Sequence, residues 1–168
     1  MAAKISPPSG TVTFLFTDIE GSTRLWEEHP AEMQVALQRH DEILRSVIED
    51  QQGYVFSTAG DAFSAAFARV ADALNAAGGA QMALGAERWP SGTPVRVRMG
   101  LHTGEAQERD GNFFGSAVNR AARIMSAGHG GQVLVSAETA ALGAGVGEFG
   151  LRCLGRHRLK DLGDPVEV

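Results

Sequence analysis

Two strand-like runs, 53–58 and 62–67, follow one another with only a three-residue Ala-Gly-Asp connection between them. Apolar and aromatic runs separated by so short a glycine-containing link predict a β-hairpin. A helix-length stretch flanks the hairpin on each side, because apolar residues recur at helical spacing over 31–48 and an alanine-rich segment covers 69–86. A hairpin between two helices, with further strands outside them, is the pattern of the ferredoxin-like split βαβ fold.

The rest of the chain supplies those outer strands and a C-terminal addition. The other expected elements are a strand over 11–16, a strand from Val95 to 102–104, a helix over 116–127, a strand over 133–136, a short helix, and a strand pair around 149–160 and 166–168. The predicted fold class is α+β, a βαββαβ core with added C-terminal αββ elements. We expect 1–9 to form a tail and 10–168 one domain, and the strand pattern at the end favours a part excised from a longer protein.

Composition excludes several classes of function. The 168 residues are 43% hydrophobic, which suits one domain with a real core. No apolar run reaches the about 20 residues that span a bilayer, and the N-terminus lacks a signal-peptide pattern, so we expect a cytoplasmic protein without membrane insertion. The net charge of −5 and the scattered basic residues argue against a nucleic-acid partner. Cys153 is expected to be inert core inside a strand, and His40 a packed neutral histidine of the first long helix.

Two aspartates stand at turns that follow strand-like runs. Asp18 lies in FTDIEGST, where a strand end is followed by small and hydroxyl residues at a helix start, a pattern that suits polyphosphate and metal binding. Asp61 lies in the hairpin connection, and if the first strand neighbours the hairpin the two carboxylates face each other and favour a cation between them. The alternative is structural: Asp18 as a helix cap and Asp61 as a polar turn residue.

The helix over 116–127 carries a second candidate pair. Asn119 and Arg123 are four residues apart and therefore share one face of the helix. A guanidinium beside an amide can stabilise a phosphoryl transition state and orient a sugar oxygen. The same pair is equally suited to hydrogen bonding at the surface, and this alternative stays open on spacing alone.

Five motifs in order resemble the catalytic domain of class III nucleotidyl cyclases, in particular the adenylyl cyclases of actinobacterial type. They are FTDIEGSTRLWEEHP, the GDAF after YVFSTA, VRMGLHTGEA, FFGSAVNRAARI and HRLKDLGDPVEV. The resemblance runs from about Gly10 to the last residue. It implies a homodimer with nucleotide sites at the subunit interface, ATP as substrate and two divalent cations, Mg²⁺ or Mn²⁺, in each site.

The resemblance also implies roles for individual residues. Asp18, Asp61 and the Ile19 carbonyl would bind the metals, Asn119 would orient the ribose, Arg123 would stabilise the transition state, and Lys160 would contact the terminal phosphates. The residues matched to the substrate-binding turn are Phe16, Thr17, Ile19, Glu20, Gly21, Ser22 and Thr23. The implied reaction is in-line attack of the ribose 3′-hydroxyl on the α-phosphorus, with release of pyrophosphate.

The base-reading positions depart from the family pattern. Adenylyl cyclases of this class use a lysine and an aspartate where this chain has Ser57 and Asn112. Neutral hydrogen bonds discriminate less than charged ones, so we expect slow ATP turnover with relaxed base choice, and GTP as a further substrate. The alternatives are a guanylyl cyclase, a cyclase-like domain that binds a nucleotide or partner without turnover, and a purely structural module.

Overall fold

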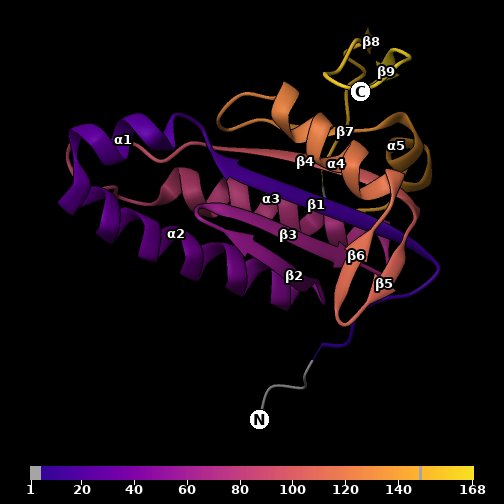
Figure 1. Ribbon diagram of the computed structural model, residues 1–168, viewed down its shortest axis with the longest axis horizontal. Helices are drawn as coiled ribbons and strands as arrows, with labels where there is room; N and C mark the ends of the chain where they lie inside the picture. Colours follow the sequence, from indigo (N-terminus) through magenta and orange to yellow (C-terminus); the bar gives the residue numbers. More distant parts are fainter. Residues whose placement is uncertain (1–4, 148) are drawn as a thin grey trace.

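A five-stranded sheet in the order β2-β3-β1-β4-β7 organises the chain (Figure 1). The computed structural model describes residues 5–147 and 149–168. The strands are β1 (Thr11–Ile19), β2 (Tyr54–Ala59), β3 (Ala62–Phe67), β4 (Val97–Glu105) and β7 (Val133–Val135). β1 is antiparallel to both β3 and β4, and β7 joins the edge parallel to β4. The order β4-β1-β3-β2 is that of a ferredoxin-like core, so the predicted fold class is confirmed.

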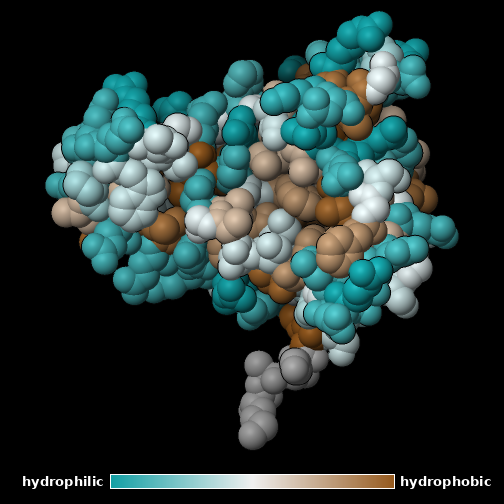
Figure 2. All heavy atoms as spheres, in the orientation of Figure 1, coloured by the Kyte–Doolittle hydropathy of each residue, from teal (hydrophilic) through white to brown (hydrophobic). Residues whose placement is uncertain are grey.

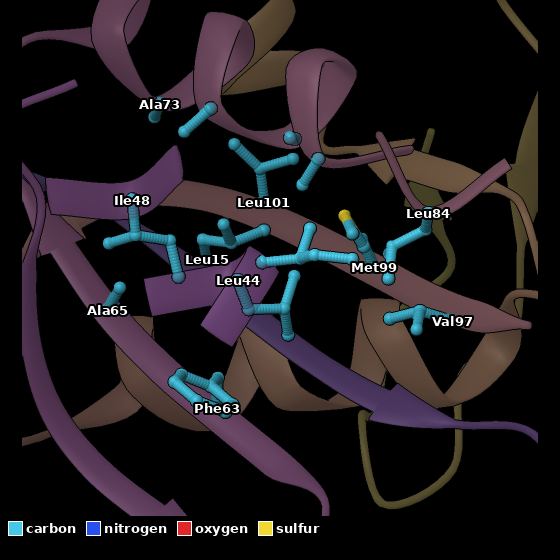
Figure 3. Packing of buried hydrophobic residues seen from close by; sticks show 14 of the residues in the cluster. Leu15, Leu44, Ile48, Phe63, Ala65, Ala73, Leu84, Val97, Met99 and Leu101 are labelled. Carbon is cyan, nitrogen blue, oxygen red and sulfur yellow. The ribbon is translucent and has the colours of Figure 1, made fainter. Parts of the chain in front are cut away.

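Helices cover both faces of this sheet. They are α1 (Ser22–Glu28), α2 (Pro30–Asp50), α3 (Val70–Ala86), α4 (Ser116–Ala127) and α5 (Ala137–Gly143). The larger core lies between the sheet and α2 with α3, where Leu15, Leu44 and Met99 are fully buried (Figure 3). A smaller cluster lies on the opposite face, where Phe14 of β1 packs with Ala117 and Ala121 of α4. Because both faces of β1 are covered, the apolar residues Phe14, Leu15 and Phe16 follow one another in its centre.

His40 confirms its expected role as a packed residue of α2. The side chain is 0% exposed and its ring packs edge-on against Phe63, with the centroids 5.9 Å apart. Burial lowers the pKa of His40, and a 2.8 Å contact between its Nδ1 and the Asp41 carboxylate opposes that shift only in part. His40 is therefore held neutral in the core.

The helix start expected after the first strand is confirmed, whereas one hairpin was not expected from the sequence. The short helix α1 begins directly after Gly21, whose positive φ of 68° provides the turn out of β1. A small hairpin of β5 (Gln107–Arg109) and β6 (Asn112–Phe114) precedes α4. Its two turn residues, Asp110 and Gly111, both have positive φ, as a type I′ hairpin turn requires. These strands are too short for an alternating pattern to show.

The expected long strand at 149–160 is wrong. Only β8 (Arg156–His157) forms there, paired with β9 (Val166–Glu167). Cys153 is exposed and lies outside any strand, which contradicts its expected place in the core. The alternation in FGLRCLG imitates a strand, but this segment pairs with no strand of the five-stranded sheet. No helix of the described residues is long and apolar enough to cross a membrane.

Candidate active site

The β2-β3 turn places Asp61 against the end of β1. Gly60 and Asp61 form a two-residue connection in which Gly60 takes the positive φ of 59°. The Ile19 N–H donates to Asp61 Oδ2 at 2.6 Å, and the Ser22 hydroxyl lies 3.4 Å from Oδ1. Asp61 is thereby fixed against two residues that closely follow Asp18 in the chain. That the two carboxylates face each other stays a prediction.

Asp18 is engaged by an arginine that the sequence reading missed. Arg98 of β4 stands directly opposite Asp18 in the strand register. Its Nε donates to Asp18 Oδ1 at 2.5 Å and its Nη2 to Oδ2 at 2.9 Å, which makes a two-point ion pair. The Arg98 side chain is 30% exposed and the Asp18 side chain 21%. This hydrogen bond to Asp18 raises the pKa of Arg98 above its ordinary value. The only sequence signal was the alternation in VRVR, which sets Arg96 and Arg98 on one face of the strand.

The carboxylates of Asp18 and Asp61 lie at one end of the sheet, and both raise the pKa of Arg98 through their negative charge. Within residues 5–147 and 149–168 no three His, Cys, Asp or Glu side chains gather as a metal cluster. Asp18 and Asp61 alone cannot complete the shell of a hard divalent cation, which needs about six oxygens. The donor set fits a cation that takes its other oxygens from backbone, water or a bound phosphate. The pairing with Arg98 shows that positive charge is favoured there.

The predicted substrate-binding turn exposes only some of its side chains to a bound substrate. Glu20, Gly21 and Thr23 are exposed, and Ser22 is half-buried beside Asp61. Thr17 is fully buried, and its hydroxyl has no hydrogen-bond partner. Thr17 can therefore contribute to a bound phosphate only through its backbone, and Phe16 presents a half-buried ring on the opposite face of β1.

Helix α4 presents the second group of predicted residues. Asn119 is exposed, and Arg123 pairs through Nη2 with Asp161 Oδ2 at 2.6 Å. Lys160, which precedes Asp161, lies exposed in a turn between β8 and β9 and not in the expected strand. Leu159 packs in one cluster with Ile124 of α4, so the turn is held close to the helix. The structure brings Arg123 and the Lys160 turn together through Asp161, a partner that was not expected from the sequence.

The two groups stay apart within one chain. Among the described residues, no hydrogen bond or ion pair joins Asp18 or Asp61 to Asn119, Arg123 or Lys160. Arg98 lies between them, because its Nη1 also donates to the Ser126 carbonyl at the end of α4 at 3.2 Å. A single chain thus offers two half-sites, one carrying carboxylates and one carrying cations.

Ser57 and Asn112 lie on neighbouring elements on one face of the sheet. A β-bulge between Val55 and Ser57 shifts the register, so that Ser57 pairs with Ser64 and shares its face. Without the bulge, strict alternation would turn Ser57 toward α2 and α3. Asn112 begins β6, and both Ser57 and Asn112 are exposed.

The structure also contains a cavity of about 830 Å³ away from all of these residues. It lies between β7, α5 and the segment that follows α5, and its lining includes Val135, Ala140, Val146 and Leu151. None of the residues predicted to bind substrate or metal lines it. Apart from Thr17 and Ile19, which are buried, the predicted residues are at least partly exposed.

Comparison with known proteins gives consistent matches. The family model described as the adenylate and guanylate cyclase catalytic domain matches residues 5–167. An uncharacterized protein of Mycobacterium tuberculosis is 42% identical over 166 residues, which cover 96% of this chain and 56% of that protein. An adenylate cyclase of Mycosarcoma maydis is 39% identical over 158 residues, covering 79% of this chain and 6% of that enzyme.

Solved structures show the same architecture. A structure of adenylate cyclases from Trypanosoma brucei in their monomeric state superposes with a TM-score of 0.84 at 26% identity, covering 96% of this chain and 88% of that one. The chain spans only about half the length of the mycobacterial relatives that it matches.

Proposed function

The chain belongs to the family of adenylate and guanylate cyclase catalytic domains, and from that membership we propose that it converts ATP to 3′,5′-cyclic AMP and pyrophosphate. The observation that carries the proposal is the hydrogen bond from the Ile19 N–H to Asp61, which sets the Asp61 carboxylate against the residue that follows Asp18. Relatives between 34% and 39% identical are adenylate cyclases, which supports ATP as the substrate.

Asp18, Asp61 and the Ile19 carbonyl would hold two divalent cations, Mg²⁺ or Mn²⁺. When bound, the cations would supply Lewis-acid activation of the 3′-hydroxyl and charge neutralisation on the leaving pyrophosphate. Arg98 now neutralises Asp18 through both carboxylate oxygens, so it would have to release at least one of them. In this exchange a metal cation takes the place of the Arg98 guanidinium at Asp18, so the partly buried carboxylate stays paired with positive charge.

The cationic half-site would act on the substrate itself. Arg123 is 38% exposed and paired with Asp161. It would exchange this partner for the α-phosphate, where negative charge builds in the transition state. Asn119 on the same face would orient the ribose, and Lys160 would contact the terminal phosphates. Ser57 and Asn112 would face the edge of the base.

We further propose that two chains assemble the site as a homodimer. The two half-sites do not join within one chain, and Figure 2 shows apolar residues gathered over the middle of the sheet face seen in Figure 1. Phe16, Tyr54 and Phe56 are only half-buried there. An exposed apolar surface of this kind is suited to contact with a second copy of the chain.

The direct test is formation of cyclic AMP from ATP with Mn²⁺ by the purified chain. We expect product in the wild type and in the control Asp50→Ala, at the exposed end of α2. Asp61→Ala should abolish it. Nucleotide binding without product in the wild type would favour the binding-only alternative, and absence of both would favour the structural one.

Complementation tests the dimer separately. Asp61→Ala and Arg123→Ala should each be inactive alone, because every site takes Asp61 from one chain and Arg123 from the other. Mixing equal amounts should restore about a quarter of wild-type activity, since half of the dimers are mixed and each has one intact site. The reference is a mixture of Asp61→Ala with the exposed-surface variant Arg88→Ala, in which each mixed dimer carries one Asp61 substitution. A mixture of the two inactive variants that stays inactive would contradict the shared site.

A further inference from the structure

The cavity beside β7 lies at an open edge of the five-stranded sheet. Leu134 of β7 packs in one cluster with Ile124 of α4 on one face of the sheet, and the next residue, Val135, belongs to the larger core on the other face. Both line the cavity, so the cavity lies at the edge of the sheet and not over one of its faces. β7 is the last strand on that side, and its one strand neighbour among the described residues is β4 (Figure 1).

The backbone of β7 turns two residues toward this cavity. The Gln132 carbonyl accepts from the Met99 N–H of β4, and the Ser136 N–H donates to a carbonyl of β4, each at 3.0 Å. Because the backbone groups of successive residues alternate between the two sides of a strand, those of Val133 and Val135 face the open edge. Strand-edge N–H and C=O groups of this kind are a template to which another extended chain can add.

The walls of the cavity are largely apolar. Ala140 of α5 lines it, together with Val146, Leu151 and Leu154 of the segment that follows α5. These last three side chains are 44%, 45% and 40% exposed, although they border an apolar space. The volume of about 830 Å³ lies within the range that ligand pockets have, roughly 300–1,000 Å³. Exposed apolar side chains around such a space indicate a binding site.

The wall opposite β7 is anchored at both of its ends. A Cβ added at Gly78 of α3 would lie 2.4 Å from the Phe149 ring, so this ring packs closely against α3. At the other end, the Leu154 N–H donates to the Val168 carbonyl at 2.9 Å. The residues 149–154 therefore hold the cavity open beside β7, and their attachment on both sides keeps them from collapsing onto the strand.

The charged residues that line the cavity are Arg152 and Glu167. Glu167 Oε1 already accepts a hydrogen bond from the Cys153 thiol at 3.4 Å. Arg152 is exposed and takes part in no ion pair among the described residues. The guanidinium is thus the charged group without a partner, which favours a ligand that carries a carboxylate.

We propose that this cavity is a binding site for a short apolar peptide with a free carboxylate, which adds to the open edge of β7 as a further strand. Its backbone pairs with the N–H and C=O groups of Val133 and Val135, its side chains fill the space beside Ala140 and Leu151, and its carboxylate pairs with Arg152. The site shares no residue with the predicted cyclase site, so it does not depend on the proposed function.

The probe is the tripeptide acetyl-Leu-Val-Leu with a free C-terminal carboxylate, titrated into the whole chain by calorimetry. We expect a Kd of about 10 to 100 μM, as a ligand of this size allows. The same peptide with a C-terminal amide loses the pair with Arg152, and the form N-methylated at every backbone nitrogen loses the donors that face β7. Each altered peptide should bind about tenfold more weakly or worse. An N-methylated peptide that binds as tightly as the parent overturns the proposal, because it shows apolar capture without strand addition.

Two variants test the cavity itself. Ala140→Phe narrows it and should abolish binding, whereas the control Val35→Phe, at an exposed position of α2, should leave the Kd unchanged. Arg152→Gln should bring the Kd values of the carboxylate and amide peptides within about threefold of each other. Thermal unfolding shows whether Ala140→Phe keeps its fold, and if it does not, Arg152→Gln at its exposed position decides.

Three results would overturn the proposal. The first is no binding of the parent peptide by the wild type at about 1 mM. The second is a preference for the carboxylate peptide that survives in Arg152→Gln. The third is a dimer of the chain that excludes the peptide and that Ala140→Phe dissociates, since the edge of β7 would then belong to a second copy.

Discussion

Gly100 of β4 is the position where the structure most directly couples packing to the half-site on α4. A Cβ added at Gly100 would lie 2.3 Å from the Met125 backbone nitrogen and 2.6 Å from its Cα. Ordinary contacts of a Cβ lie at 3.4–4 Å, so relief of the clash requires α4 to move away by about 1 Å. A backbone helix atom cannot swing aside as the end of a side chain can.

Two consequences follow for Gly100→Ala. Overpacking of this kind costs about 1 to 3 kcal/mol in the free energy of unfolding. Because Asn119 and Arg123 travel with α4, a displacement of about 1 Å should lower turnover by about a hundredfold. Both values come from one displacement, so they should appear together in urea denaturation and in steady-state cyclisation of ATP.

The matched control is Gly85→Ala. Gly85 lies in the last turn of α3, has no heavy atom within 4 Å of its built Cβ and is not in a left-handed conformation. There the same substitution should stabilise the chain by about 0.5 to 1 kcal/mol, because alanine favours the helix, and leave turnover unchanged. A Gly100→Ala variant as stable and as active as Gly85→Ala would refute the close packing of α4 on β4.

Two further predictions concern charge and protonation. Arg98→Met removes the partly buried two-point ion pair with Asp18, so it should lower the free energy of unfolding by about 1 to 3 kcal/mol in metal-free buffer. Mn²⁺ should then raise the melting temperature of this variant more than that of the wild type. The control Arg45→Met, at an exposed ion pair, should change the free energy of unfolding by less than about 1 kcal/mol. His102, whose pKa is lowered chiefly by burial, binds fewer protons folded than unfolded. The free energy of unfolding should therefore fall as the pH drops from about 7 through the unfolded-state pKa of histidine, near 6.5. The denaturation midpoints measured at the two ends of this pH range should differ less in His102→Gln than in the wild type. An equal difference in both proteins would contradict this role of His102.

The sequence was sufficient for the elements whose pattern is long or strongly marked. The hairpin at 54–67 and the helices α2, α3 and α4 were predicted within a few residues, because each buries one continuous face or is bounded by glycine or proline. The expected strand at 149–160 failed for a related reason. Alternation predicts which residues could pair, but whether a neighbouring strand is within reach depends on the whole sheet.

The site shows the same division. The approach of Asp61 to the end of β1 could be predicted, since β3, which follows the Asp61 turn, neighbours β1 in the sheet. That the Asp18 and Asp61 carboxylates face each other stays a prediction. The Arg98 pair with Asp18 and the Asp161 pair with Arg123 could not, because each depends on a register or a turn that joins positions 80 and 38 residues apart along the chain. Such contacts leave no periodic trace in a sequence.

β4 connects these observations, because it contacts both halves of the site. Arg98 reaches Asp18 on one side and the Ser126 carbonyl of α4 on the other, and two residues later Gly100 lets α4 approach the strand. The distance between the carboxylates and α4 within one chain is therefore set by the rigid sheet and not by a flexible loop. In the proposed homodimer the placement of the second copy is not set by β4, so activity can change through dimer assembly as well as through the sheet, α4 or the turns that carry Asp61 and Lys160.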